Sequence, residues 1–449
     1  MTFNSSWLAV IAPLLVLAVV SLARQMKRRQ AARSALAQAR EAGLDEPLSL
    51  HPVVDPTRCL GCASCIDACP EHGVLQIVDG RTHLVDASHC VGHGRCKDAC
   101  PADALELVFG TPKRPMQVPV LDDALQSGVP GLYVAGELGG LGLIRNALTQ
   151  GLRAVEALSA GLSPSKEADV LDVAIVGAGP AGIAAALACR ERGLRHLILD
   201  QEGLGGSVNH YPRQKLVMTS PIKLPVVGRM YFREVHKEDL LKFWEQVVAR
   251  GRLELNAPAR VVDVQRNCKS FIIETSAGQV RAQRVVLATG RRGTPRKLGV
   301  PGEDCSKVAY RLLEPDRYRD QDVLVVGGGN SAVEAANSLA QERARVTLSY
   351  RGSAFKRVAG PNLERLEALR GAQLQLVLES QVRSIEPQRV FLESPDGGRW
   401  LRNDQVFVFV GGELPTKFLE KIGIEMATYK GEPQRPPSRP ANVPVGGRS

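Results

Sequence analysis

The stretch DVAIVGAGPAGIAAALACRERGLRHLILD, residues 172–200, has the pattern of a buried strand, a glycine turn, a helix and a second strand. Gly177, Gly179 and Gly182 have the spacing that allows a tight turn, a close approach of backbone to a pyrophosphate, and close helix packing. The N-terminus of such a helix favours phosphate charge, and Asp200 stands where a carboxylate accepts hydrogen bonds from a ribose. The flanking strand and helix make the motif more specific than a lone glycine triplet. The stretch therefore predicts a dinucleotide site in an α/β sheet.

Length and charge narrow the class of protein. The 449 residues correspond to about three domains. Most of the formal net charge of +10 comes from the two ends of the chain, RQMKRRQAAR at 24–33 and a tail rich in Pro and Arg. Aromatic residues make up 4% and do not alternate with basic ones, so we do not expect a nucleic acid partner. The tail, 429–449, has too few apolar residues to pack and is predicted to be disordered.

An apolar segment lies near the N-terminus. Residues 7–23, WLAVIAPLLVLAVVSLA, are 17 uncharged residues, close to the lower limit of about 17 for a spanning helix. A signal peptide is the alternative, but no basic residue precedes the segment, and it ends in a basic cluster instead of a small-residue cleavage site. We expect an anchor over 1–23 and a solvated helical stalk over 24–50. The positive-inside rule then predicts a single-pass protein of the inner (cytoplasmic) membrane with its catalytic domains in the cytoplasm.

Seven of the ten cysteines lie in two runs between residues 59 and 100. The first run has the complete C-x2-C-x2-C-x3-C-P spacing, and a proline also follows the last cysteine of the second run. The cytoplasmic placement and these prolines argue against a disulfide framework. Over residues 52–110 the spacing resembles two-cluster bacterial ferredoxins, which implies a small α+β dicluster domain at 51–110 where the last cysteine of each run serves the other cluster. One 4Fe-4S cluster would use Cys59, Cys62, Cys65 and Cys100, and the second would use Cys69, Cys90 and Cys96.

The second run departs from this pattern at one position. His93 stands three residues after Cys90, where the pattern has a cysteine. Three alternatives remain open at this point: ligation by the imidazole, a three-iron (3Fe-4S) cluster held by three thiolates, or a 4Fe-4S cluster with one corner bound to water. Imidazole suits iron, although sulfur ligands dominate cubane sites. His93 is therefore a candidate ligand of lower rank than the cysteines.

Residues 129–160, VPGLYVAGELGGLGLIRNALTQGLRAVEALSA, have the pattern of a buried strand, a glycine loop and an amphipathic helix. The unit resembles the element that closes the flavin domain of thioredoxin reductases at its C-terminus. There an acid after the strand binds the ribityl chain, which implies that role for Glu137 beside Gly136. Because the unit precedes Gly177, the resemblance implies a circular permutation in which residues 111–165 complete an FAD-binding domain at 170–292. A connector with a coincidental glycine loop is the alternative.

Two further segments resemble the same superfamily. Residues 203–221, GLGGSVNHYPRQKLVMTSP, look like its bacillithiol-disulfide-reductase-like branch. Gly205 and Gly206 suit backbone that passes close to a flavin ring, and the candidates for catalytic groups near the ring are His210, Tyr211 and Arg213. Thr289 and Gly290, after the strand at 284–287, resemble the second flavin-side turn of the family.

A second strand, glycine turn and helix follow in DVLVVGGGNSAVEA, residues 322–335. The pyrophosphate triplet is matched by Gly327, Gly329 and Ala332, with Asn330 and Ser331 inside it. Where an NAD-binding unit has an acid after its second strand, this chain has the cations Arg351, Lys356 and Arg357. Cations suit a 2′-phosphate, so we expect NADPH in preference to NADH, a solvated basic loop being the alternative. Residues 293–428 are the predicted NAD(P)H-binding domain with its return to the FAD domain.

One absence bears on function. Thioredoxin reductases carry a Cys-x-x-Cys pair before the second glycine turn, and residues 311–314 here are Arg-Leu-Leu-Glu.

The predicted fold class is α/β, with two Rossmann-like three-layer domains preceded by the ferredoxin-like domain and the transmembrane helix. The predicted function is a membrane-anchored iron-sulfur flavoprotein that passes electrons from NADPH through FAD and the clusters to a redox protein or small-molecule acceptor, with a homodimer left open. The alternatives are a flavin-dependent disulfide reductase of a low-molecular-weight thiol with accessory clusters, and a non-catalytic redox or iron sensor.

Overall fold

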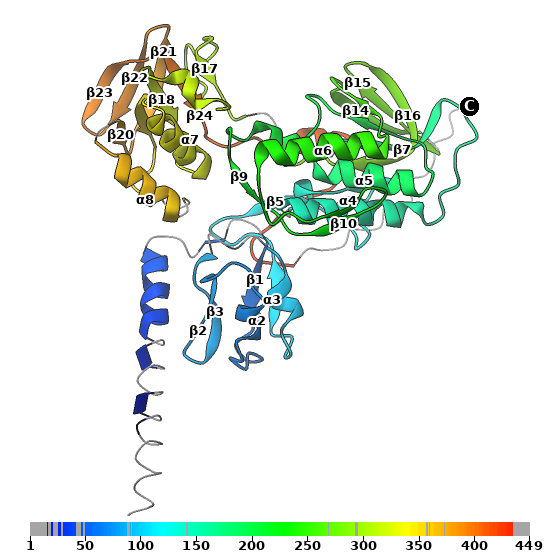
Figure 1. The fold of residues 1–449 in the computed structure, drawn as a ribbon, viewed down its shortest axis with the longest axis horizontal. Helices are drawn as coiled ribbons and strands as arrows, with labels where there is room; N and C mark the ends of the chain where they lie inside the picture. The colour runs from blue at the N-terminus through cyan, green and yellow to red at the C-terminus, as the bar shows by residue number, and fades with distance from the viewer. Residues whose placement is uncertain are drawn as a thin grey trace, which may run out of the picture. The chain divides into compact units, whose positions relative to one another are not determined.

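The computed structural model describes residues 16, 19–20, 26–27, 30–41, 46–47, 50–87, 90, 92–140, 142–267, 269–291, 295–355, 358, 360–371 and 373–433. These residues divide into two compact units (Figure 1). The smaller unit ends at Arg114 and includes Lys430–Pro433 from the far end of the chain, and the larger unit comprises Pro115–Tyr429.

The smaller unit combines short antiparallel strand pairs with one-turn helices. β1 (His51–Val54) pairs with β4 (Leu105–Val108), and β2 (Leu75–Val78) pairs with β3 (Arg81–Leu84). The helices are α2 (Ser64–Asp67) and α3 (Arg95–Asp98). A unit of this size buries little apolar surface and needs a further source of stability, such as a bound metal. Cysteine side chains take up much of its small core, which consists of Cys65, Val74, Leu75, Cys96 and Leu105.

The larger unit contains a first α/β sheet with the strand order β13-β8-β7-β16-β15-β14, and β6 also pairs with β16. One face of its parallel strands is covered by helices that share a core with β7 and β8, and the other face packs on the antiparallel strands β14 and β15 and on α9 (Thr416–Lys421). The covering helices are α4 (Ile144–Ser159), α5 (Pro180–Glu191) and α6 (Lys237–Gly251). The parallel strands are β6 (Leu132–Val134), β7 (Val170–Val176), β8 (His196–Leu199), β13 (Leu255–Asn256) and β16 (Gly278–Leu287), and the antiparallel ones are β14 (Val261–Asn267) and β15 (Ser270–Thr275).

The segment predicted to be permuted lies inside this sheet. β6 runs parallel to β16, with Tyr133 opposite Val286, and α4 packs against α5. The two helices approach so closely that a Cβ atom at Gly151 would lie 2.1 Å from the carbonyl oxygen of Ala181. Residues 129–160 therefore share one core with β7 and α5 of the same chain, which a mere connector would not do.

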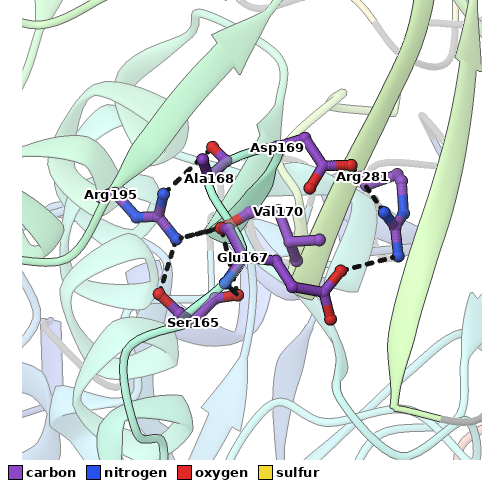
Figure 2. Close-up of polar contacts among 7 residues, drawn as sticks. All are labelled: Ser165, Glu167, Ala168, Asp169, Val170, Arg195 and Arg281. Atoms are coloured by element: carbon purple, nitrogen blue, oxygen red, sulfur yellow. Dashed lines mark hydrogen bonds and ion pairs between the residues drawn. The ribbon is translucent and has the colours of Figure 1, made fainter.

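Residues 160–169 join α4 to β7, and Figure 2 shows how this joint is held. Arg281 forms ion pairs with Asp169 at 2.6 Å and with Glu167 at 3.3 Å. The guanidinium of Arg195 donates hydrogen bonds at 2.7–3.2 Å to the carbonyl oxygens of Ser165, Glu167, Ala168 and Val170. Because charge-assisted hydrogen bonds are strong, they fix the joint that the permuted order requires.

A second parallel sheet has the order β17-β24-β18-β19-β20. Its strands are β17 (Val308–Ala309), β18 (Asp322–Val326), β19 (Arg345–Ser349), β20 (Leu374–Val377) and β24 (Gln405–Val408). One face packs on α7 (Asn330–Gln341) and α8 (Gly360–Leu369), and the other on the antiparallel strands β21 (Gln381–Glu386), β22 (Arg389–Ser394) and β23 (Gly397–Arg402). The predicted α/β class with paired three-layer domains is confirmed (Figure 1).

Short elements complete the larger unit. β5 (Met116–Pro119) pairs with β25 (Met426–Tyr429), so the two ends of this unit lie side by side. The other short elements are the pairs β9 (Leu216–Met218) with β12 (Glu234–His236) and β10 (Ile222–Leu224) with β11 (Gly228–Met230), and the 3-10 helices η2 (Glu137–Gly139), η3 (Gly206–His210) and η4 (Pro315–Tyr318).

Two sequence-based predictions about the chain ends need correction. The predicted tail starts too early, because Phe109 exchanges backbone hydrogen bonds with Gly431 and Glu432. The predicted stalk is not solvated on all sides, because Ala32 packs against Val78 and Val85. In both cases a few well-placed contacts order residues whose composition is mostly polar.

Other predictions fall outside the described residues. These are most of the predicted anchor, the cations Lys356 and Arg357, and residues 434–449. Within the described part of the chain, no helix has the length and apolar character needed to cross a bilayer.

Candidate functional site

The turn after β7 has the backbone shape that a pyrophosphate requires. Gly177 has a φ of 114°, and a Cβ atom there would lie 2.4 Å from the carbonyl oxygen of Ala288. A Cβ atom at Gly182 would lie 1.8 Å from the carbonyl oxygen of Gly177, so only glycine fits at either position. Gly179 precedes α5, and no side chain caps the N–H groups at the start of this helix. The turn and the uncapped helix together form a cradle that fits a phosphate.

Asp200 directly follows β8 and stabilises this cradle. One carboxylate oxygen accepts a hydrogen bond from the Ala178 N–H at 2.7 Å, and the other accepts from the N–H groups of Glu202 and Gly203, both at 2.8 Å. The oxygen that accepts from Ala178 retains a second lone pair for a ribose hydroxyl. The turn that follows packs on the cradle, because a Cβ atom at Gly206 would lie 2.9 Å from the Cα of Gly179.

The permuted segment brings Glu137 to the same edge of the sheet. Gly136, with a φ of 87°, donates its N–H to the side-chain oxygen of Gln150 at 2.7 Å. Burial lowers the pKa of the Arg291 guanidinium, and the nearby charge of Glu137 acts against this shift. The Ala135 N–H donates to the carbonyl oxygen of Leu287 at 2.9 Å, so Glu137 lies at the same edge of the sheet as the turn that contains Thr289 and Gly290. This is the edge at the carboxyl ends of the parallel strands, where α/β sheets bind ligands.

The second glycine turn repeats the geometry of the first. A Cβ atom at Gly327 would lie 2.4 Å from the carbonyl oxygen of Phe409 and 3.0 Å from the Cβ of the buried Ala332. Gly329 precedes α7, whose N–H groups also lack a side-chain cap. The residues present thus fit a second dinucleotide.

A cavity of about 770 Å³ lies between the loop that follows β8 and the second glycine turn. Its volume falls within the range of roughly 300–1,000 Å³ that is usual for ligand sites. Its walls include Asp200, Gly206, His210, Tyr211, Thr289, Gly327, Gly329, Asn330, Ser331 and Arg351. The other predicted residues do not line it; these are Gly136, Glu137, Gly177, Gly179, Gly182, Gly205, Arg213, Gly290 and Ala332.

An ionic network stands in the wall of this cavity. The carboxylate of Glu202 contacts His210 Nε2 at 2.8 Å and receives two hydrogen bonds from Arg311 at 2.8 and 3.0 Å. The hydrogen bond from Arg311 holds the pKa of Glu202 below its usual value, and the charge of His210 acts in the same direction while burial opposes both. By the resemblance to thioredoxin reductases, the first cysteine of a dithiol would stand at Arg311. In this chain an ion pair occupies that position.

A second ion pair lies nearby. The sequence places Lys215 near the flavin ring, but it does not predict that Lys215 pairs with Glu334, just as it does not predict the role of Glu202. Lys215 Nζ is 2.7 Å from Glu334 Oε2 and 5.0 Å from the centre of the Tyr211 ring. Glu334 belongs to α7, so this pair links the flavin-side loop to the second glycine turn. The partners stand 119 residues apart, and no pattern in the sequence indicates the pairing.

Thr82 on β3 contacts two cysteines of the first run. The Thr82 hydroxyl lies 3.3 Å from Cys65 Sγ and 3.8 Å from Cys59 Sγ, and its N–H donates to Cys59 Sγ at 3.5 Å. Burial acts to raise the pKa of Cys59, yet N–H groups of Thr82 and Gly61 hold it below its usual value. Cys100 Sγ accepts the N–H of Ala104 at 3.3 Å. Such donors suit sulfur atoms that carry negative charge in an iron-sulfur cluster.

The residues predicted for the second cluster line a cavity of their own. These are Cys69, Cys90, His93 and Cys96, together with apolar side chains. Burial raises the pKa of Cys96 to about 12, and it raises those of Cys69 and Cys90 as well. Buried thiols of this kind ionise when a metal supplies positive charge. Within the described residues, no three His, Cys, Asp or Glu side chains are close enough to hold a single ion, whereas a cubane cluster spaces its ligands around four irons.

Two cysteines outside the runs are described, and they lie far apart in the sequence. Cys189 is fully buried in α5, and burial raises its pKa to about 12, which makes it a core residue. Cys305 is half-buried and Cys268 lies outside the described residues.

Together the fold and the sites define an α/β oxidoreductase with two dinucleotide sites and a ferredoxin-type domain. Residues 174–439 match the pyridine nucleotide-disulphide oxidoreductase family, and residues 51–101 match the 4Fe-4S dicluster domain. The chain belongs to the pyridine nucleotide-disulphide oxidoreductase family. It is an enzyme that uses FAD and NADPH and carries iron-sulfur clusters, which confirms the predicted class and cofactors and contradicts the non-catalytic alternative.

Several characterised proteins are similar to this chain. Bacilliredoxin reductase Bdr of Bacillus subtilis is 33% identical over 266 residues, which cover 58% of this chain and 82% of that protein. Ferredoxin–NADP reductase of Ignicoccus hospitalis is 26% identical over 263 residues, 57% of this chain and 82% of that protein. The structure of bacillithiol disulfide reductase Bdr from Staphylococcus aureus matches with a TM-score of 0.52 and 27% identity, over 57% of this chain and 81% of that one.

Proposed function

We propose that this iron-sulfur flavoprotein oxidoreductase passes electrons from NADPH through FAD to its clusters and then to a redox protein or small-molecule acceptor. The observation that carries the proposal is the Arg311–Glu202 ion pair beside the dinucleotide cavity, where a dithiol relay would stand, in a chain that also contains two cysteine runs for clusters. Bound FAD supplies the conversion of a hydride into single electrons, which is the form that clusters accept.

The residues of the chain have separate tasks in this function. The two glycine turns hold the pyrophosphates, and Arg351 in the cavity wall is placed to bind a 2′-phosphate. Arg311 fixes Glu202, which in turn fixes the imidazole of His210 in the same wall. His210 is therefore a positioned group that can exchange a proton near the flavin.

A second candidate function is the reduction of a low-molecular-weight disulfide, with the clusters as accessories. The similarity to the two Bdr reductases and the segment His210-Tyr211-Pro212-Arg213 support it. Against it, the cysteines outside the cluster runs are the single residues Cys189, Cys268 and Cys305, and none forms a Cys-x-x-Cys pair.

Steady-state turnover separates the two candidates. The full chain, loaded with cofactors, is mixed anaerobically with NADPH and either a one-electron acceptor or a low-molecular-weight disulfide such as bacillithiol disulfide. We expect turnover with the one-electron acceptor, a decrease of about tenfold or more in the Cys62→Ser variant, and no change in the matched Cys305→Ser variant. Disulfide reduction at the rate of NADPH oxidation in all three proteins would favour the second candidate.

We also propose a membrane location, from the uncharged segment 7–23 and the basic residues that follow it. Cell fractionation of the full chain and of a chain that starts after Arg29 tests this. The full chain should sediment with the inner membrane and resist a carbonate wash, and the shortened chain should remain in the supernatant with its flavin bound. Recovery of both chains in the supernatant would contradict the anchor.

A further inference from the structure

We propose that His93 is the fourth ligand of the second cluster and that Glu71 is the positioning residue for its imidazole. The proposal rests on the assignment of Cys69, Cys90 and Cys96 to that cluster, which is part of the proposed function. It does not depend on the direction of electron flow.

The first observation is the backbone around His93. Cys62, in the complete first run, stands between Gly61 and Ala63, which have φ values of 64° and 65°, and α2 begins at the next residue. His93 stands between Gly92 and Gly94, with φ values of 74° and 79°, and α3 begins at the next residue. The histidine thus occupies the backbone position that a thiolate occupies in the first run.

This conformation is imposed by the structure and not by flexible glycines alone. Ala63 adopts the left-handed region although it carries a Cβ atom, which costs free energy. In the second run, a Cβ atom at Gly92 would lie 2.8 Å from the carbonyl oxygen of Leu50. The loop at Gly92 therefore packs closely against the backbone just before β1. The Cα–Cβ bond of residue 93 therefore has a fixed direction relative to α3.

The second observation is the cavity that His93 shares with the three cysteines. Cys69, Cys90, His93 and Cys96 all line it, and its remaining walls are largely apolar, with Val74, Leu75 and Leu107 among them. The His93 side chain is 23% exposed, so most of the imidazole is turned away from solvent. Three thiols and one imidazole around an apolar hollow make a ligand set that iron accepts.

The third observation is an acid beside the imidazole. Glu71 follows Cys69-Pro70, and its Oε1 lies 4.0 Å from His93 Nε2. Histidine ligands commonly donate the N–H of their second ring nitrogen to a carboxylate, which fixes the tautomer and the ring orientation. The Glu71 side chain is 41% exposed and can rotate to shorten this contact to a hydrogen bond.

The charge of the site follows from this ligand set. Three thiolates and a neutral imidazole carry one negative charge fewer than four thiolates. A less negative site accepts an electron more readily, so this cluster should have the higher reduction potential of the two. Electrons that enter the domain would then collect at the cluster bound by His93.

The test uses the full chain with both clusters reconstituted and chemically reduced with dithionite, so it does not require electron flow from NADPH. The protein is labelled with ¹⁵N-histidine, and pulsed electron paramagnetic resonance measures nitrogen coupling to the reduced clusters. We expect a directly bound nitrogen in the wild type and in His72→Ala, an exposed neighbour that serves as the matched control. The coupling should be lost in His93→Cys and His93→Ala.

Two further readouts separate ligation from a structural role. Mössbauer spectra should show a three-iron cluster in His93→Ala and a complete 4Fe-4S cluster in His93→Cys, whose lower midpoint potential should be confined to one cluster. Glu71→Gln should keep the nitrogen coupling and shift that same midpoint. Wild-type protein with two complete clusters and no bound nitrogen would overturn the proposal, whatever the outcome of the turnover experiments.

Discussion

The substitution Gly151→Ala tests whether α4 belongs to the flavin-binding sheet. A Cβ atom at this position would lie 2.1 Å from the carbonyl oxygen of Ala181, 3.0 Å from its carbonyl carbon and 3.1 Å from the Cβ of Ala184. The carbonyl is part of the α5 backbone, so no side-chain rotation can relieve the overlap. The two helices have to separate by about 1 Å to restore van der Waals contact.

The sign of the change in the free energy of unfolding shows whether α4 is exposed at Gly151 or packed closely against α5. Gly→Ala in an exposed helix interior stabilises by about 1 kcal/mol. Overpacking of a close contact costs about 1–3 kcal/mol and sometimes more. Separation of the helices also weakens the packing of Leu148 and Val155, which are fully buried in the shared core. We expect a net loss of about 2 kcal/mol in the free energy of unfolding, or roughly 5 °C in midpoint temperature for a domain of this size.

The assay follows release of FAD on heating, by flavin fluorescence, in protein loaded to the same flavin content. Gly142→Ala is the matched control, because a Cβ atom at Gly142 meets nothing within 4 Å. The release temperature should decrease for Gly151→Ala and stay the same for the control. A Gly151→Ala protein at least as stable as the wild type would mean that α4 does not pack on α5, and the permuted arrangement would be wrong.

Other predictions concern three side chains. Arg351→Ala should lower kcat/KM for NADPH by about tenfold, because a charge-assisted contact to the 2′-phosphate is lost, and should leave kcat/KM for NADH unchanged; an equal decrease for both would contradict the assignment. Glu202→Gln should destabilise the protein at neutral pH, and because the pKa of Glu202 is lowered in the fold, its advantage over Gln should disappear as the pH falls through that lowered value. A difference between the two proteins that grows in acid would refute this. Arg195→Ala should destabilise by about 2 kcal/mol through its lost carbonyl contacts, and Arg195→Lys by less; equal denaturation midpoints for all three proteins would show that the joint in Figure 2 does not matter.

The glycine turns could be predicted because their requirement is local. At Gly177, Gly182 and Gly327 a Cβ atom would collide with nearby backbone. Glycine at these positions therefore indicates the close backbone approach in each turn. The strand and helix of the permuted segment were recognisable for a similar reason, since a buried strand, a glycine loop and an amphipathic helix each leave a periodic pattern.

The ionic network could not be predicted in this way. Glu202 and Arg311 stand 109 residues apart, and exposed charges carry no periodicity that shows which partners the fold brings together. For the same reason, the sequence did not show that residues 430–433 are ordered. Residues 430–433 have a composition typical of disorder, yet backbone hydrogen bonds between Phe109 and Gly431 and Glu432 attach them to the smaller unit.

Anaerobic rapid mixing of the full chain with NADPH, followed by absorbance and by freeze-quenched electron paramagnetic resonance, tests the proposed electron path. We predict that flavin absorbance decreases first and that signals of reduced clusters appear afterwards. In Cys62→Ser the flavin phase should persist while the signal of the first cluster is lost. Flavin reduction with both clusters oxidised throughout, accompanied by turnover of a low-molecular-weight disulfide, would contradict the electron path and establish the clusters as accessories.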